Sequence, residues 1–208
     1  MFLLYQKKYK TYPETIEIDG SIYHINADFR NILRIFDMID NEDIPVSKKF
    51  RKLKEWFFEC DLPENISGET GAEAFIDFVD VERNAETFTE YVLVNEEFEK
   101  QFCYNFDAEE IYAGFISEYG IDLVDVEFLH WYKFRILLEN LPPESAFKRK
   151  VELRLMDLNN LSAGNGRKFA ELERAKESVQ LPVRNPQARE DLQVTKEFNE
   201  IWGKAGNN

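Results

Sequence analysis

The chain has 208 residues, of which 44% are hydrophobic, and a formal net charge of −14. This apolar content is enough for a folded core and excludes a globally disordered chain. The apolar runs are far shorter than the roughly 20 residues that cross a bilayer, and Met1–Tyr5 is too short for a signal peptide. We therefore expect a soluble cytoplasmic protein. Its acidic charge argues against nucleic-acid binding, because phosphates would be repelled.

The negative charge is concentrated in the middle of the chain. Between Glu59 and Glu110 there are 16 acidic residues and only two basic ones, whereas acidic and basic residues balance in the rest. A solvated face that keeps the protein in solution explains this segment. A surface that docks a basic partner or imitates nucleic acid is the alternative, and the sequence leaves both open.

The N-terminal region predicts a β-hairpin followed by two helices. Asp19-Gly20 is a favoured two-residue turn, which places Ile16, Ile18, Tyr23 and Ile25 on one face of a hairpin over residues 13–26 and leaves His24 exposed. We expect Asn26 to cap a helix that carries apolar residues from Phe29 to Ile39, and Ser47 to cap a second helix with a basic outer face.

The middle of the chain predicts a loop over Leu62–Gly71, a short helix over Ala72–Val81 and an ambiguous, more helical stretch over Phe88–Phe106. Asp107 with Glu110 reads as a capping pair that opens a helix, and Gly120 reads as its left-handed C-cap.

The next predicted helix runs from an Asp122 cap to Leu141, before Pro142-Pro143. Its apolar residues lie on nearly every side, which is typical of the buried centre of a bundle. Ser145 begins a further helix with the apolar stripe Phe147, Val151, Leu155 and Leu158, and with Arg154 among the basic residues beside it.

A last helix of the main domain is marked by Phe169, Leu172 and Val179. We therefore predict a mainly α fold, a helical bundle with a small N-terminal β-hairpin, as one domain over residues 1–182. Residues 183–208 are predicted to be a linker and an amphipathic tail helix with the stripe Val194, Phe198, Ile201 and Trp202. This stripe either packs on the protein's own core or docks into a partner's groove.

No catalytic site, metal site or cofactor motif is predicted. The chain lacks a phosphate-binding loop and a His-Glu-x-x-His motif. His130 lies beside Trp131 in an apolar stretch, so we expect a core histidine rather than a base. Cys60 and Cys103 read as free thiols in a core. The carboxylate pairs Asp77/Asp80 and Asp122/Asp125 are better explained by helix capping than by Mg²⁺ binding or by a metal-dependent hydrolase.

Three strings in the second half of the chain resemble the bacteriophage gene-product-fifteen family. They are Tyr119-Gly-Ile-Asp-Leu123, Leu129-His-Trp-Tyr-Lys-Phe134 and Arg154-Leu-Met-Asp-Leu158. The resemblance extends over roughly residues 13 to 182. Its motif core consists of Tyr119, Gly120, Asp122, Leu129, His130, Trp131, Phe134, Met156 and Asp157.

This chain departs from the family pattern at three places. Tyr132 stands where a second Trp is usual, Asn140 stands where a Gly is common, and the acidic stretch Ala85–Glu99 is longer than the family norm. These departures leave the expected fold in place.

The resemblance implies a tail assembly chaperone of siphophages, acting in the host bacterial cytoplasm. Its implied partners are the tape-measure protein and tail-tube subunits, with no nucleic acid and no membrane, and self-association stays open. It implies no catalytic residue. An acidic inhibitor that mimics DNA is the alternative of a different class. The interleaving of Phe75, Phe78, Phe88, Tyr91 and Phe98 with the carboxylates argues against this alternative.

Overall fold

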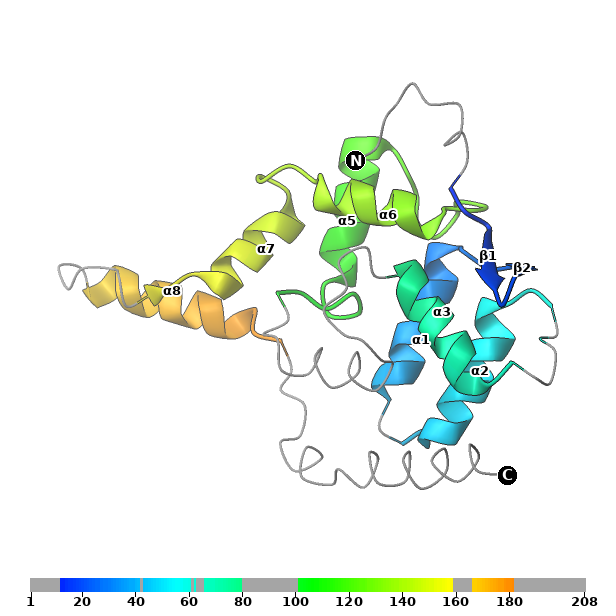
Figure 1. Cartoon of the computed structure of the whole chain (residues 1–208). Coiled ribbons are helices and arrows are strands. Elements are labelled where there is room, and N and C mark those ends of the chain that lie inside the picture. Colours follow the sequence, from blue (N-terminus) through cyan, green and yellow to red (C-terminus); the bar gives the residue numbers. More distant parts are fainter. Residues whose placement is uncertain are drawn as a thin grey trace. The chain divides into compact units, whose positions relative to one another are not determined.

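The fold is mainly helical and carries one small hairpin, as predicted (Figure 1). The computed structural model describes residues 12–41, 43–60, 62, 66–79, 101–158 and 166–181. These residues form two compact units. Unit 1 takes its described residues from 12–79 and Phe128–Phe134, and unit 2 takes them from 101–127 and 135–181. No helix in the described ranges is long and apolar enough to span a bilayer.

The predicted hairpin is confirmed. Strands β1 (Thr15–Ile18) and β2 (Ser21–His24) pair antiparallel with Ile16 opposite Tyr23. The turn needs positive φ at both central positions, and Asp19 and Gly20 adopt φ values of 50° and 77°. Ile18 and Ile25 are buried and His24 is exposed, so the apolar face points inward as expected.

Helices α1 (Phe29–Asp40), α2 (Val46–Phe57) and α3 (Gly68–Val79) build unit 1. α2 packs against both α1 and α3 (Figure 1). The hairpin reaches them through Phe58, whose ring meets Tyr23 edge-on with centroids 6.4 Å apart. The unit's buried core is mainly aromatic and β-branched, and includes Ile32, Ile35, Phe50, Phe57 and Phe75.

Three predicted helix starts in unit 1 are wrong by two to four residues. Asp28 caps α1 instead of Asn26, because its carboxylate accepts the Arg30 amide at 3.0 Å. α2 begins at Val46 after Pro45, without a side-chain cap from Ser47. α3 begins inside the predicted loop, where the Ser67 hydroxyl accepts the Thr70 amide at 3.0 Å.

Helices α5 (Ala108–Tyr119), α7 (Ala146–Leu155) and α8 (Gly166–Ser178) belong to unit 2. The Ser145 cap of α7 is confirmed, since its hydroxyl accepts the Lys148 amide at 3.3 Å. The predicted stripe of α7 is only partly right. Phe147 is buried, but Leu155 is 47% exposed and Arg154 is buried in its place.

The predicted helix from Asp122 to Leu141 is wrong in extent. α6 covers only Trp131–Glu139, and residues 121–130 form turns and an extended stretch. The helix is also not buried all round, since Ile136 is 38% exposed. α6 contributes Trp131–Phe134 to unit 1 and its remaining residues to unit 2.

Other predictions concern residues outside the described ranges or are corrected by the observed exposure of the side chains. Of the predicted, more helical stretch Phe88–Phe106, residues 88–100 lie outside the part of the chain that the structure describes, as does the tail helix. Residues 101–106 are described and form a bend and turns, so a helix there is wrong. Both cysteines are free thiols, but Cys60 is exposed and Cys103 is half-buried, so neither belongs to a core. Cys60 follows the end of α2 and Cys103 lies in the turns before α5, both outside the helices that supply the buried core.

Candidate functional site

The first motif string forms a corner at the end of α5. Gly120 has φ 63°, and its amide donates to the Ile116 carbonyl at 3.0 Å, which confirms the left-handed C-cap. The Tyr119 hydroxyl donates to the Leu137 carbonyl of α6 at 2.8 Å. The corner therefore joins the end of α5 to the second half of α6.

Asp122 closes a local turn instead of capping a helix. Its Oδ1 accepts the Val124 amide at 2.9 Å and the Asp125 amide at 3.3 Å, while its Oδ2 accepts the Tyr112 hydroxyl at 3.1 Å. The hydrogen bond from the Val124 amide, supported by those from Asp125 and Tyr112, lowers the pKa of Asp122. This carboxylate is occupied by turn formation, and the helix starts nine residues later.

The second motif string enters unit 1 as an extended segment. The Phe29 amide donates to the Leu129 carbonyl at 3.0 Å, and the Trp131 amide donates to the Ala27 carbonyl at 2.8 Å. The Leu129 amide also donates to the Asp28 carboxylate at 3.2 Å, across 101 residues of sequence. These bonds hold Leu129 and Trp131 beside the start of α1.

His130 is buried, as predicted, with both ring nitrogens engaged. Nδ1 accepts the Tyr132 amide at 3.1 Å, because a backbone N–H can only donate. Nε2 must then carry the proton, which it donates to the Pro13 carbonyl at 3.0 Å. Burial lowers the pKa of His130, while the hydrogen bond to Pro13 and the charge of Glu14 oppose that shift. The ring is therefore a neutral structural link.

Trp131 and Phe134 complete the aromatic core of unit 1. Each is 1% exposed. Phe134 stacks on Phe29 with centroids 4.7 Å apart, and Trp131 meets Phe36 edge-on at 5.6 Å. Such pairs add about 0.5–1.5 kcal/mol each beyond the burial of their surface. We call Leu129, His130, Trp131 and Phe134 the aromatic node.

The third motif string supplies a buried cation that sequence reasoning placed beside the apolar stripe of its helix. Arg154 donates from Nη2 and Nη1 to the Asp107 carboxylate at 2.8 and 3.1 Å. Its Nε donates to the Val179 carbonyl at 2.7 Å, and Nη1 also donates to the Gln101 carbonyl at 2.6 Å. We call Arg154 and Asp107 the ionic clamp, which ties three separate chain segments of unit 2 together.

Lys150 extends the clamp. Its Nζ lies 3.1 Å from Asp107 Oδ1 and 2.9 Å from Glu110 Oε1, so Glu110 pairs with Lys150 instead of completing a capping box. Burial alone would raise the pKa of Asp107, but the hydrogen bonds from Arg154, Cys103 and Lys150 outweigh it and leave that pKa lowered. Asp107 is therefore an ionised structural anchor. It precedes α5 without making the predicted side-chain cap.

Arg154 carried a signal in the sequence that our prediction overlooked. It lies seven residues after Phe147 and three after Val151, so it shares their inward face on α7. The other two motif-core residues of this string lie nearer the surface. Met156 is half-buried and accepts the Lys176 ammonium on its carbonyl at 2.5 Å, and Asp157 is exposed.

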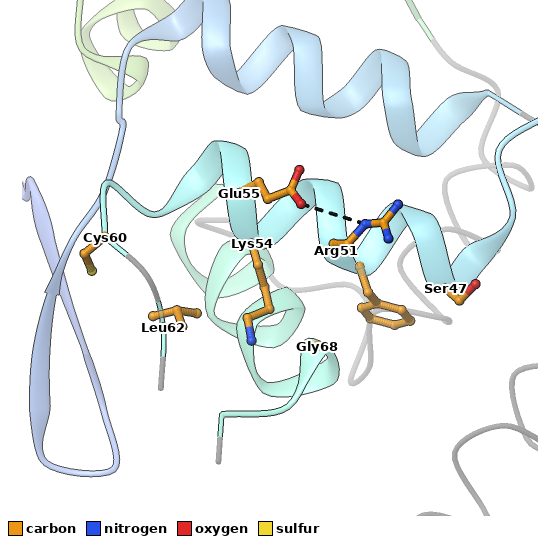
Figure 2. A pocket seen from close by; sticks show the side chains of 8 residues that line it. Ser47, Arg51, Lys54, Glu55, Cys60, Leu62 and Gly68 are labelled. Carbon is orange, nitrogen blue, oxygen red and sulfur yellow. Dashed lines mark ion pairs between the residues drawn. The ribbon is translucent and has the colours of Figure 1, made fainter. Parts of the chain in front are cut away.

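A shallow hollow of about 360 Å³ lies between α2 and α3 (Figure 2). Phe50 forms part of its lining, with the polar residues Ser47, Arg51, Lys54 and Glu55 around it. Lys54 Nζ already donates to the Ile66 carbonyl at 2.9 Å, and Arg51 lies 3.8 Å from Glu55. The charged groups of the hollow are thus engaged with the protein itself.

The motif residues build the fold and do not converge on a reactive centre. The three strings lie at a corner of unit 2, in the core of unit 1 and in the ionic clamp. Within the described ranges, no group of three or more His, Cys, Asp or Glu side chains could hold a metal ion. The candidate partner-binding residues Val194, Phe198, Ile201 and Trp202 lie beyond Leu181, the last residue that the structure describes.

Large apolar side chains are exposed in the same stretch as the motif. Among the described residues, eight large hydrophobic side chains are exposed, and four of them fall between residues 116 and 136. These are Ile116 (42%), Val124 (72%), Phe128 (50%) and Ile136 (38%). Sequence reasoning missed Val124, Phe128 and Ile136, because it expected residues 122–141 to form a buried helix.

Comparison with known proteins agrees with the resemblance in the motif strings. A family model described as Bacteriophage Gp15 protein matches residues 10–181. No curated protein and no solved structure gives a significant match. The family match covers most of the chain and includes all three motif strings, so this protein belongs to the bacteriophage Gp15 protein family.

Proposed function

We propose that this protein is a phage tail assembly chaperone that binds the tape-measure protein, tail-tube subunits or both, and that it is not an enzyme. Family membership makes it a phage-related protein. The observation that favours a binding role is that unit 2 exposes three large apolar side chains between residues 116 and 136, namely Ile116, Val124 and Ile136. Apolar surface of this kind is typical of contacts with partner helices.

The engagement of the motif's polar groups supports the same proposal. The nitrogens of His130, the carboxylate of Asp122 and the guanidinium of Arg154 are all used in bonds within the protein. A general base or nucleophile needs a free group within reach of a substrate. Binding through apolar side chains requires no such group.

Co-expression with the tape-measure protein of the same phage tests the proposal. We expect the tape-measure protein to be recovered soluble and to co-purify with this chain. Recovery should fall when Val124 is changed to Glu, because a charge replaces an exposed apolar contact. The matched control is Ile22→Glu on the hairpin, since Ile22 is also 72% exposed but lies outside the motif stretch.

Two outcomes would contradict the proposal. In the first, the tape-measure protein stays insoluble and does not co-purify with the unmodified chain. In the second, Val124→Glu and Ile22→Glu reduce recovery equally, which would separate client binding from the motif stretch.

A further inference from the structure

His130 stands at the junction of two elements of unit 1. α6 begins at Trp131, so His130 occupies the position immediately before the helix. Its Nδ1 accepts the amide of Tyr132, the second helical residue, at 3.1 Å. This is the bond that a capping side chain makes, and here a neutral imidazole makes it.

The other side of the ring holds the beginning of the described chain. Nε2 donates to the Pro13 carbonyl at 3.0 Å, and the Tyr12 ring stacks on the imidazole with centroids 4.9 Å apart. Two residues after Pro13 the chain enters β1. A single ring thus connects the start of α6 to the segment that leads into the hairpin.

Protonation would break this connection at one defined atom. A charged imidazole carries N–H at both nitrogens, so Nδ1–H would point at the Tyr132 N–H and the cap would be lost. The positive charge would also lie at the N-terminal end of a helix, where the helix dipole is unfavourable for cations. Because His130 is only 5% exposed, water has little access to the ring and cannot stabilise its charge.

The groups around the ring do not offset this cost fully. Glu14 is the neighbouring charge that favours the protonated ring. Asp28, which lies beside His130, is already engaged, because its carboxylate accepts hydrogen bonds from Arg30 and from the Leu129 amide. Tyr132 donates its hydroxyl to the Phe78 carbonyl, and Asp77, next to Phe78 on α3, is exposed. Burial accordingly leaves the pKa of His130 below its ordinary value of 6.5.

We propose that His130 is an acid-sensitive lock, whose neutral ring caps α6 while it holds the Tyr12–Glu14 segment, and whose protonation breaks the cap while Nε2 still donates to Pro13. The direction in which stability changes with pH follows from the linkage between proton binding and folding. Because the folded protein lowers the pKa, the lock stabilises the fold fully above pH 6.5, and this contribution is lost as pH falls below that value.

Unfolding by urea at pH 7.5 and pH 5.5 tests the lock with His130→Asn as the comparison. Asparagine can cap a helix and does not titrate. Between the two pH values, we expect the folded-to-unfolded ratio of the unmodified chain to fall by up to about tenfold more than that of the variant. An equal fall in both proteins would overturn the proposal.

Nitrogen-15 NMR of the unmodified protein tests the lock without a variant. We expect the Nε2–H tautomer at pH 7.5, a titration midpoint below 6.5, and, as the ring charges, a loss of protection of the Tyr132 amide against exchange relative to its intrinsic rate at each pH. The Lys148 amide is the control, because its cap Ser145 does not titrate. An Nδ1–H tautomer, or a Tyr132 amide that follows Lys148 through the titration, would contradict the proposal.

Discussion

The aromatic node of unit 1 and the ionic clamp of unit 2 hold their segments by different physics. The node relies on buried rings and on a neutral histidine that bonds to backbone groups. The clamp relies on a fully buried carboxylate paired with a guanidinium and an ammonium. Buried rings stabilise in proportion to their contacts, whereas a buried ion pair is costly to break on one side only. The same family motif therefore produces two anchors that should respond differently to mutation.

Trp131→Ala should cause the largest loss of stability. Its side chain is 1% exposed, and truncating a buried Trp costs about 3–5 kcal/mol of unfolding free energy. Urea unfolding followed by circular dichroism measures this value. The control is Trp56→Ala, since Trp56 is half-buried under Arg34 and Lys52 and should lose about 1–2 kcal/mol of cation–π attraction. Equal losses would show that Trp131 is not a core anchor.

Arg154→Met should cost about 3 kcal/mol, because it leaves Asp107 buried with a charge. Lys150 still lies 3.1 Å from that carboxylate, which keeps the loss at the low end of the range for a broken buried pair. Removing both charges, with Arg154→Met and Asp107→Leu, should restore most of the stability. Arg149→Met on the exposed side of α7 should change it by less than about 0.5 kcal/mol.

The double variant distinguishes the two kinds of anchor. If it is as unstable as Arg154→Met alone, the clamp contributes through the bonds of Arg154 to Gln101 and Val179, and the cost of an unpaired carboxylate is minor.

The smallest expected effect concerns the corner at Gly120. Gly120→Ala should cost about 1 kcal/mol, because φ 63° is unfavourable for a residue with a Cβ. Gly114→Ala is the comparison. Its Cβ would meet Leu141 at 3.0 Å, but a helical Gly-to-Ala change gains about 1 kcal/mol, so the net change should be close to zero. Equal thermal unfolding of the two variants would argue against strain at Gly120.

Local signals in the sequence predicted the elements whose causes are local. The Asp19-Gly20 turn, the Ser145 cap and the Gly120 C-cap depend on residues within a few positions, and all three were confirmed. The helix predicted from Asp122 failed because its cause is distant. Residues 121–130 are held by the Asp122 turn and by the bonds of Leu129 to Asp28 and Phe29, about a hundred residues away.

The ionic clamp also depends on residues that are distant in the sequence, so local signals did not predict it. Asp107 resembled a helix cap and Arg154 resembled a basic residue beside the apolar stripe, and only their meeting in space makes both buried. The exposure of Val124 and Phe128 was likewise invisible to a pattern of apolar residues, since periodicity does not report which face is covered.

Light scattering on material co-purified with the tape-measure protein tests the proposed function most directly. We predict one species that contains both chains, whose yield falls with Val124→Glu and is unchanged with Ile22→Glu. A preparation in which this protein elutes alone, while the tape-measure protein remains in the insoluble fraction, would contradict the account.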